Sequence, residues 1–464
     1  MIDTQEIRKK ILSLALTGKL VEQNSSDTPA HQLVESLSGS LNNHPFENDI
    51  SAQEIPYEIP DSWVWCRLSD IGTTNIGLTY HPQDLAEDGT IVIRSSNIIK
   101  GKMDYADLVK VKCQIRENQY LKRNDIVICA RNGSKALVGK CAIYEGDSDV
   151  ISFGAFMAIF RTPFFQYAYL YFNSPVFRRN FSNDDSKQIN QVTQNILKNS
   201  LIPIPPEEEQ KRITDKINSV FSFLDTIDTL QSQYQDNLAT LKSKIIDAGI
   251  QGKLTEQLPE DGTAEELYQQ IHTNQGIEKK DIADINADLP EIPFTWCWVH
   301  LGDIVRVLGG KRIPAGRKLT TEDTGHKYIR ISDMKNRSVD AEKLLFVPED
   351  IYPSIAQYII HKEDVYITVA GTIGRVGKIP ESVDGANLSE NADRLVFSNL
   401  DQDWLIYCLT STFVQKQIEY LTTQVAQPKL AIKRIQEFLL PLPPLAEQKR
   451  IVAKLEELLP LCEG

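Results

Sequence analysis

The sequence predicts an α/β fold in which two similar globular domains are separated by two long antiparallel coiled-coil helices, with a pseudo-twofold axis between the halves. Three observations predict this fold class: an internal repeat, a long apolar stripe at helical spacing, and short β-rich runs in the remaining regions. The 464 residues suffice for two domains with separate cores. With 41% hydrophobic and 24% charged residues, the composition is that of a folded globular protein.

The internal repeat is the strongest of these observations. The segment ILSLALTGKLVEQ, which starts at Ile11, returns as IIDAGIQGKLTEQ from Ile245. The segment IPDSWVWCRLSDIG from Ile59 likewise returns as IPFTWCWVHLGDIV from Ile292. Because the segments keep their order and an offset of about 235 residues, we interpret the halves as diverged copies of one unit.

The repeat has a circular order. One long segment runs from the Pro-Pro motif at 205–206 to the GKL motif at 252–254, but only about twenty residues follow the second Pro-Pro motif at 443–444. The missing part lies at residues 2–20. The two chain ends would therefore together form one copy of what the middle forms continuously, as expected for halves related by a twofold axis.

The segment 206–250 predicts the longest helix, because its apolar residues follow the alternating four-three spacing of a coiled-coil seam. The seam positions are Ile213, Ile217, Val220, Leu224, Ile227, Gln231, Tyr234, Leu238, Leu241 and Ile245. A stripe of this length needs a partner helix, which the segments around Ile7 and Ile451 would supply. An ordinary core helix is the alternative, since Gln231 interrupts the seam.

Two regions differ from this helical pattern. Short β-rich runs such as TIVIRSSNI and EDVYITVA alternate with turn residues, and helical stretches follow at 166–182 and 402–421. The predicted division is 1–25, a helical segment that completes the second long helix; 26–53, a linker; 54–205, the first domain; 206–250, the central helix; 251–288, a connector; 289–443, the second domain; and 444–464, a C-terminal helix. Trp63, Trp65, Trp296 and Trp298 alternate like strand residues and are expected in the domain cores.

The charge distribution bears on possible partners. A net charge of −13 argues against binding of nucleic acid through bulk electrostatics, because phosphate binding draws on local Lys and Arg. Basic residues nevertheless exceed acidic ones by about six between 100 and 140 and by about five between 311 and 337. Ordinary solvated surfaces would show the same clusters.

The sequence also bears on location. No apolar run reaches the roughly 18 to 20 residues that cross a bilayer, and the start MIDTQEIRKK lacks the apolar stretch of a signal peptide. Seven scattered cysteines without a CxxC pair suggest reduced thiols. We therefore expect a cytoplasmic protein that does not bind membranes.

The motifs of catalysis are missing from the sequence. It contains no Asn/Asp-Pro-Pro-aromatic motif, no HExxH, no Cys/His metal spacing and no GxSxG. The loops Gly133–Lys140 and Gly371–Lys378 lack the Ser or Thr that follows the lysine in a nucleotide-binding loop. A duplicated binding protein without catalytic or metal site is therefore favoured over an enzyme.

Several motifs resemble those of the specificity subunits of type I restriction-modification enzymes. They are PLPPLAEQKRIVAKLEEL, PIPPEEEQKRI, the two IP..W.W..L.DI entries, ITVAGTIGRVGK and the GKL helix ends, and the similarity spans nearly the whole chain. The RNGSKALVGK segment of the first copy departs from the glycine-rich form in the second.

The resemblance implies two target-recognition domains that each read one half of a bipartite double-stranded DNA site. It also implies two methyltransferase subunits and two restriction subunits as partners. This chain would bind no cofactor itself, because S-adenosylmethionine, ATP and Mg²⁺ would belong to the partner subunits. The alternative from another class is a non-enzymatic coiled-coil adaptor with two protein-binding domains, which the acidic net charge favours.

Base reading requires polar side chains on exposed turns. The candidates in the first domain are Arg94, Ser95, Asn97, Arg131, Asn132, Ser134, Lys135, Gln188, Asn190 and Gln191. The candidates in the second domain are Lys311, Arg312, Arg317, Arg330, Ser332, Thr372, Arg375, Gln424, Gln427 and Lys429. Lys140 and Lys378 are expected to contact phosphates, which hold the register without reading sequence. A solvated or structural role is the alternative for each residue.

Overall fold

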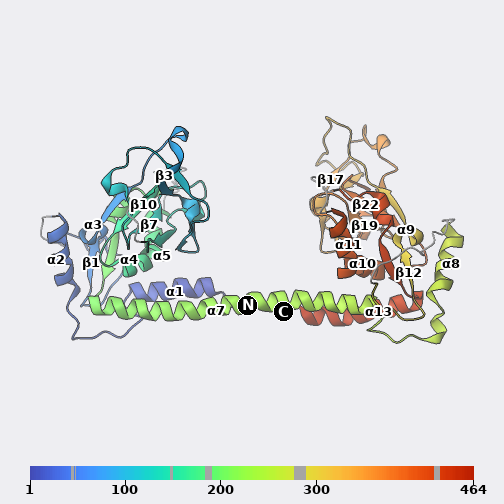
Figure 1. Cartoon of the computed structure of the whole chain (residues 1–464), viewed down its shortest axis with the longest axis horizontal. Helices are drawn as coiled ribbons and strands as arrows, with labels where there is room; N and C mark the ends of the chain where they lie inside the picture. Colours follow the sequence, from blue (N-terminus) through green and yellow to red (C-terminus); the bar gives the residue numbers. More distant parts are fainter. Residues whose placement is uncertain are drawn as a thin grey trace. The chain divides into compact units, whose positions relative to one another are not determined.

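The computed structural model describes residues 1–42, 46, 49–146, 150–182, 191–275, 289–422 and 429–463. The chain forms two units, Met1–Gln231 and Ser232–Gly464. One helix, α7 (Glu207–Ile250), has 44 residues and belongs to both units. In Figure 1 it is the long green helix.

Unit 1 is a mixed α/β structure. Its other helices are α1 (Thr4–Leu16), α2 (Ala30–Asn42), α3 (Leu68–Ile71), α4 (Phe165–Phe172), α5 (Pro175–Ser182) and α6 (Gln194–Asn199). Its strands are β1 (Val64–Arg67), β2 (Thr73–Ile76), β3 (Leu85–Ile93), β4 (Ile98–Ile99), β5 (Lys102–Met103), β6 (Val109–Val111), β7 (Ile126–Cys129), β8 (Cys141–Ile143), β9 (Ile151–Phe153), β10 (Met157–Arg161) and β11 (Leu201–Ile204).

Unit 2 repeats this arrangement. Its helices are α8 (Ala264–Gln275), α9 (Leu301–Ile304), α10 (Gln402–Thr410), α11 (Thr412–Thr422), α12 (Ile432–Gln436) and α13 (Leu445–Leu458). Its strands are β12 (Cys297–His300), β13 (Arg306–Gly309), β14 (Lys327–Ile329), β15 (Met334–Lys335), β16 (Ser338–Val339), β17 (Leu345–Phe346), β18 (Ile359–Ile360), β19 (Val365–Thr368), β20 (Val376–Lys378), β21 (Ala386–Leu388), β22 (Ala392–Val396) and β23 (Leu439–Leu442).

Three sheets of unit 1 correspond strand by strand to sheets of unit 2, whereas the three-stranded sheet β6-β3-β9 has a four-stranded counterpart, β17-β14-β21-β18. The four-stranded sheet β2-β10-β7-β8 of unit 1 has its counterpart in β13-β22-β19-β20 of unit 2. The pair β1-β11 likewise corresponds to β12-β23, and the hairpin β4-β5 to β15-β16. Two halves with the same strand order confirm the duplication that the sequence predicts.

The sheets β2-β10-β7-β8 and β13-β22-β19-β20 lie in the cores of their units. All four residues of β7 and of β19 are buried, which explains why apolar residues do not alternate with exposed polar ones in these runs. Trp63, Trp65 and Trp296 are buried, as predicted. Trp298 is half-buried and packs against Phe413.

Helix α1 lies antiparallel along the first part of α7 in unit 1 (Figure 1). Its start contacts the middle of α7, where the Thr4 hydroxyl donates a 2.6 Å hydrogen bond to Asp228. In unit 2 the last part of α7 packs against α13, so that a Cβ on Gly249 would lie 3.2 Å from Leu455. The partner of α7 is therefore formed by separate helices of 13 and 14 residues. These helices come from the two chain ends, where the sequence predicts the partner of α7, and among the described residues they do not form one continuous second long helix.

The seam of α7 is covered only near its two ends. Ile213, Ile217 and Leu224 are buried. Tyr234 and Leu241 are 53% and 46% exposed.

Two helices lie where the sequence suggests polar connections. In α2, Ala30 and Val34 are buried, and in α8 Leu267 and Ile271 are buried. The spacing of four residues puts each pair on one helix face. In each helix the two apolar residues lie among polar ones. The sequence therefore predicts a linker and a connector in these regions, where the structure has helices.

Candidate nucleic-acid interface

The predicted site residues of unit 1 gather around two turns. One is the 3-10 turn Ser95–Asn97 after β3, and the other follows β7 at 131–135. The Asn132 amide joins them by donating a 3.2 Å hydrogen bond to the Ser95 hydroxyl. Its oxygen accepts the Ser134 backbone N–H at 2.9 Å. Gln191 forms an isolated backbone bridge with Arg131, so three distant segments meet here.

The side chains of two of these residues make polar contacts within unit 1. Arg94 pairs with Asp107 at 2.8 Å. Asn97 is 1% exposed, and its amide donates to the backbone carbonyls of Asp104 and Asp107. Both side chains therefore hold the turn in shape, and Asn97 has no exposed amide to offer a base.

The exposed cationic side chains of this region lie on the second turn. Arg131 and Lys135 are exposed, and the Arg131 guanidinium lies 5.6 Å from the centre of the Phe156 ring. The Lys140 amine instead donates a 3.0 Å hydrogen bond to the Ile98 carbonyl, which ties this lysine to the hairpin β4-β5.

Unit 2 contains the same pair of turns. The 3-10 turn Ile331–Asp333 follows β14, and a Cβ on Gly371, in the turn after β19, would lie 3.7 Å from Ile331. Arg330 pairs with the buried Asp333 at 2.8 Å, and the hydroxyl of Ser332 donates to the same carboxylate at 3.2 Å. Arg330 thus repeats the structural role of Arg94, as the correspondence of the two copies suggests.

Other candidates of unit 2 are spread over its surface. Arg312 pairs with Glu390 at 2.5 Å, Lys378 pairs with Asp403 at 2.9 Å, and Arg317 forms an ion pair with Asp350. Lys311 lies over the Tyr358 ring, and the Thr372 carbonyl accepts the hydroxyl of Thr368. Burial raises the pKa of Asp393, and the charge of Lys429 opposes this rise. Gln188, Asn190, Gln424 and Gln427 lie outside the described residues.

A groove of about 620 Å³ adjoins the second turn of unit 2. The residues that line it are Met334, Lys335, Asn336, Arg337, Tyr366, Gly374, Arg375, Val376, Thr410 and Gln415. Three of them are cationic and none carries a carboxylate. Lys335 is also 3.4 Å from Asp340, and the Arg337 guanidinium stacks on Tyr407 at 4.9 Å. The groove therefore presents mainly hydrogen-bond donors.

The hairpin that forms one wall of this groove was not among the predicted site residues. Asn336 and Arg337 have φ of 50° and 57° in the tight turn between β15 and β16, and Lys100 and Gly101, with φ of 49° and 75°, form the equivalent turn in unit 1. The signal was present, since NIIKGKM and DMKNRSV follow the paired arginines at the same distance.

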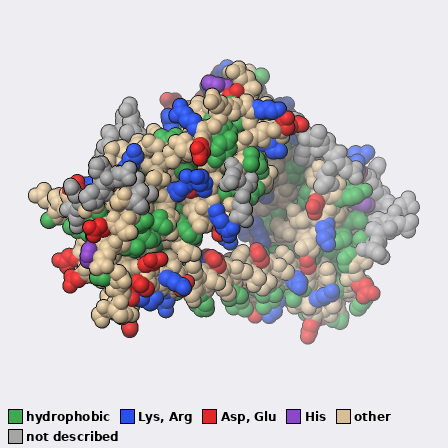
Figure 2. All heavy atoms as spheres, turned by 60° about the vertical axis from the view of Figure 1, so that its left-hand side comes forward, with side chains coloured by type: hydrophobic (Ala, Val, Ile, Leu, Met, Phe, Trp, Pro, Cys, Tyr) green, Lys and Arg blue, Asp and Glu red, His purple; other side chains and the backbone are tan. Residues whose placement is uncertain are grey.

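The surface of unit 1 in Figure 2 is electrostatically mixed. Lys and Arg side chains of the described residues are scattered among neutral and acidic ones in this view, and no face of one sign is visible there. Local groups of cations, rather than an overall field, are therefore the feature that would contact phosphates.

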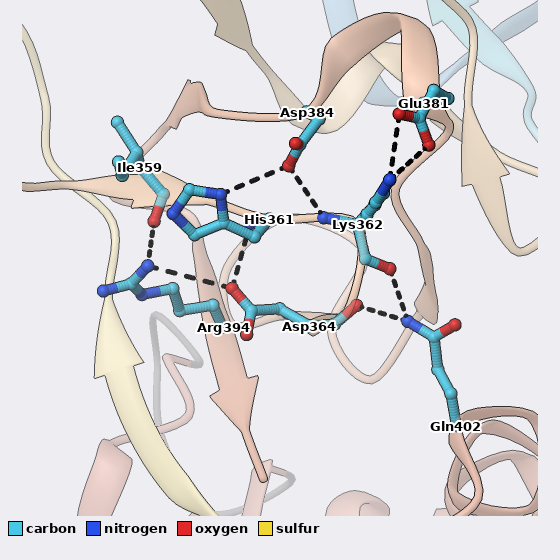
Figure 3. Close-up of polar contacts among 8 residues, drawn as sticks. All are labelled: Ile359, His361, Lys362, Asp364, Glu381, Asp384, Arg394 and Gln402. Atoms are coloured by element: carbon cyan, nitrogen blue, oxygen red, sulfur yellow. Dashed lines mark hydrogen bonds and ion pairs between the residues drawn. The ribbon is translucent and has the colours of Figure 1, made fainter. Parts of the chain in front are cut away.

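Unit 2 also carries a dense polar cluster, shown in Figure 3. The His361 ring lies 3.2 Å from Asp384, and the Lys362 amine is 2.7 Å from Glu381. Hydrogen bonds from the Lys362 N–H and from His361 lower the pKa of Asp384. The Gln402 amide donates to two backbone carbonyls of the same turn. These contacts fix the β18-β19 turn against η8 (Glu381–Val383) and α10, which is a structural role.

None of the seven cysteines forms a disulfide. Burial raises the pKa of the Cys141 thiol to about 12 and that of Cys66 well above its usual value. A raised pKa keeps a thiol protonated and weakly nucleophilic at neutral pH. Within the described residues, His, Cys, Asp and Glu side chains form no group of three that could hold a metal ion.

The helices can also be compared with the requirements of a membrane span. In the described part of the chain, none combines the length and the apolar character that crossing a bilayer requires.

Comparison with known proteins gives a consistent result. Residues 60–234 and 293–462 match the family model described as type I restriction modification DNA specificity domain. The chain is 24% identical to the type I restriction enzyme EcoAI specificity subunit of Escherichia coli, over 99% of this chain and 89% of that protein. It is 25% identical to the EcoKI specificity subunit of Escherichia coli strain K12, over 86% and 83% of the two chains.

A solved structure shares the fold. It comes from work on complex assembly and conformational transition of the type I R-M system, and it covers 88% of this chain and 92% of its own with a TM-score of 0.61 and 18% identity. The family match falls on the two repeats, which contain the paired turns described above.

Proposed function

Because this chain belongs to the family of type I restriction modification DNA specificity domains, we propose that each of its two domains reads one half of a bipartite double-stranded DNA target. The chain is a DNA specificity subunit of type I restriction-modification enzymes and is itself non-catalytic. The observation that supports two half-sites is the pair of turns that recurs in both units, at Ser95–Asn97 with 131–135 and at Ile331–Asp333 with 371–375.

The proposed contacts follow from which side chains are exposed. Arg131, Lys135 and Arg375 are exposed on the second turns, and Arg337 lies on the adjoining groove. We assign them to phosphate and base-edge contacts, because such donors match acceptors of the DNA backbone and of guanine. Ser95, Asn132 and Ser134 would shape the turn of unit 1.

The helices would set the distance between the half-sites. Half-sites read from one side of the duplex lie about 34 Å apart or a multiple of it, and 44 helical residues span roughly 65 Å. We propose that α7, with α1 and α13 as antiparallel partners, relates the two domains by a pseudo-twofold axis. Inserting a helical turn would then change the number of unread base pairs without changing the bases read.

The proposed complex is cytoplasmic. Two methyltransferase subunits and two restriction subunits would bind this chain, and S-adenosylmethionine, ATP and Mg²⁺ would be bound by those partners. The chain itself would contribute DNA contacts and a scaffold.

Sequencing of methylated bases in cells that carry the complete system, with and without this gene, tests the function. The expected result is a methylated motif with two specified parts and an unspecified gap, which disappears when the gene is removed. Methylation that does not depend on the gene would instead identify a protein-binding adaptor, and a motif without a gap would contradict the bipartite assignment.

Single variants test the proposed contacts. Arg131→Ala and Arg375→Ala in the assembled methyltransferase should weaken DNA binding, and each lost phosphate contact should lower the slope of log affinity against log salt by about 1. Lys454→Ala is the control, because its amine pairs with Glu457 on α13 at 2.8 Å. Unchanged affinity and salt dependence in both variants would remove these turns from the interface.

A further inference from the structure

A buried carboxylate connects unit 1 to the helices that carry it. Glu209, in the first turn of α7, is 0% exposed. Its two oxygens accept hydrogen bonds from the Trp63 indole N–H at 2.9 Å and from the Gln23 amide at 2.6 Å. We call Gln23, Trp63 and Glu209 the junction of unit 1. It joins the segment after α1, the entry into the domain and the start of α7.

Two further contacts surround this junction. Gly18 has φ of 69°, and a Cβ there would lie 2.4 Å from the Pro60 ring, so that only glycine allows the end of α1 to approach the domain entry this closely. Arg212, one turn along α7 from Glu209, pairs with Asp27 at 2.6 Å. The domain is therefore attached to both helices by directional contacts.

Unit 2 contains a second copy of the junction, with the same atoms in the same roles. Glu447, in the first turn of α13, is 1% exposed and accepts the Trp296 indole N–H at 2.8 Å and the Gln257 amide at 2.9 Å. The Thr255 hydroxyl adds a third hydrogen bond at 2.9 Å. The outer contacts recur as well, since a Cβ on Gly252 would lie 2.4 Å from Pro293 and Arg450 pairs with Asp261.

Stability alone does not explain a duplicated buried charge. A carboxylate loses its hydration when it is buried, and an apolar core of similar volume is often as stable or more stable. The desolvation is visible at Glu209, where burial raises the pKa in spite of the two donors. Directional hydrogen bonds do, however, allow one relative orientation of three segments where apolar contacts would allow several.

We propose that the two junctions are positioning elements, which hold each domain at one orientation on its helices and thereby make the protein discriminate between DNA targets of different spacer length. This role rests on the proposed bipartite function. The junction residues would not touch DNA. They would act through the angle at which each domain meets the duplex.

Methylation assays on spacer variants test this role. The complete methyltransferase complex would be assembled with wild-type chain, with Trp63→Phe, with Trp296→Phe and with both substitutions. The substrates would be duplexes that carry the motif found by sequencing, with the gap unchanged or altered by one base pair in either direction. Phenylalanine retains an aromatic side chain and removes the indole donor.

Trp65→Phe is the matched control. Trp65 lies in β1, two residues after Trp63, and is 5% exposed, but its indole nitrogen makes no hydrogen bond to a described residue. It therefore reports the effect of losing an indole from the core without loosening the junction. Thermal unfolding would identify any variant that fails to fold, and Gln23→Met would then replace Trp63→Phe, since it removes the other donor to Glu209.

The expected result is a loss of spacer discrimination with the base specificity intact. The preference for the natural gap should fall about tenfold in each single variant, which is the change expected when about one charge-assisted hydrogen bond is lost, and further in the double variant. Methylation of duplexes with a changed base in either half should stay low. Trp65→Phe should keep the wild-type preference.

Three outcomes would overturn the proposed role. They are an unchanged spacer preference in the folded double variant, an equal loss in Trp65→Phe, or a loss of base specificity together with spacer preference. A wild-type complex that shows base specificity but no spacer preference would contradict the bipartite function itself, and this outcome is visible before any variant is examined.

Discussion

The guanidinium of Arg161 donates two hydrogen bonds of 2.6 Å to the carboxylate of Asp125. Asp125 is fully buried immediately before β7, and Arg161 is 30% exposed at the end of the neighbouring strand β10. The Lys122 backbone N–H also donates to this carboxylate at 2.8 Å. The pair therefore satisfies a buried charge at one edge of the central sheet of unit 1.

Removing the cation from this pair should destabilise unit 1. Arg161→Met leaves Asp125 buried with the backbone hydrogen bond, and the free energy of unfolding should fall by about 3 kcal/mol. Urea denaturation measures this loss. Lys112→Ala is the control, because its pair with Asp88 is exposed on both sides and should contribute less than about 1 kcal/mol. Equal losses in the two variants would contradict this assignment.

The two glycines beside the junctions should be intolerant of alanine. Gly18→Ala and Gly252→Ala place a Cβ 2.4 Å from a proline ring at a positive φ, and each should cost more than about 1 kcal/mol. Gly39→Ala should instead raise the free energy of unfolding. Gly39 lies in α2, and outside the helix backbone no atom of a described residue lies within 4 Å of its Cβ position. Alanine favours a helix over glycine by roughly 1 kcal/mol. Thermal unfolding of the three variants tests the difference in sign.

Asp247 should stabilise unit 2 by capping α11. Its carboxylate accepts the Thr412 backbone N–H at 2.9 Å and the Thr412 hydroxyl at 2.5 Å. Asp247→Ala leaves this N–H at the helix start unpaired and should cost about 1 kcal/mol in urea denaturation. Ser13 occupies the repeated position in unit 1 and bonds only its own helix, at the Lys9 carbonyl. Ser13→Ala should therefore have a smaller effect, and a larger one would contradict the capping role.

The stability of unit 2 should depend on the ionisation of Asp393. Burial raises the pKa of this carboxyl to about 6, above the value of about 4 in an unfolded chain. The folded protein therefore keeps a proton that the unfolded chain releases between these values, so the free energy of unfolding falls as the pH rises from about 4 to about 6.

Asp393→Asn should remove this dependence and stabilise the protein at pH 7 by up to about 3 kcal/mol. Melting temperatures from pH 4 to pH 8 measure the effect. Glu419→Gln, on the exposed side of α11, should keep the wild-type profile. If the melting temperature of the Asp393→Asn variant still falls over this range, the pH dependence belongs to another group.

The circular repeat illustrates what could be predicted without coordinates. The sequence places the segment around Gly18 in correspondence with that around Gly252, and the structure gives both the same contacts with a proline ring. Such a match is predictable because a repeated motif preserves local conformation. The helix that contains Ile213, Ile217 and Leu224 was predictable from the spacing of these apolar residues along the chain.

The candidate site depends more on tertiary contacts. The sequence predicts Arg94 and Arg330 as base readers because they are polar residues at turns, and this role stays a prediction; in the structure both pair with carboxylates of their own unit. The sequence could not show these pairs, since Arg94 meets Asp107 only after the chain has passed through the hairpin β4-β5. The exposed Arg337, which we propose as a DNA contact, was not predicted because it joins Arg375 in one groove only in the folded chain.

The sequence by itself determined that the chain is duplicated, that its order is circular, and that a long amphipathic helix connects two α/β domains. Each of these properties is written in spacing or similarity along the chain. The tertiary structure decided which residues of the helix seam are buried and which residues form hydrogen bonds with one another. Tyr234 remains exposed although it belongs to the seam, and Trp63 reaches Glu209 across 146 residues. Hydrogen bonds between such distant residues depend on the folded path of the chain, and no local pattern records that path.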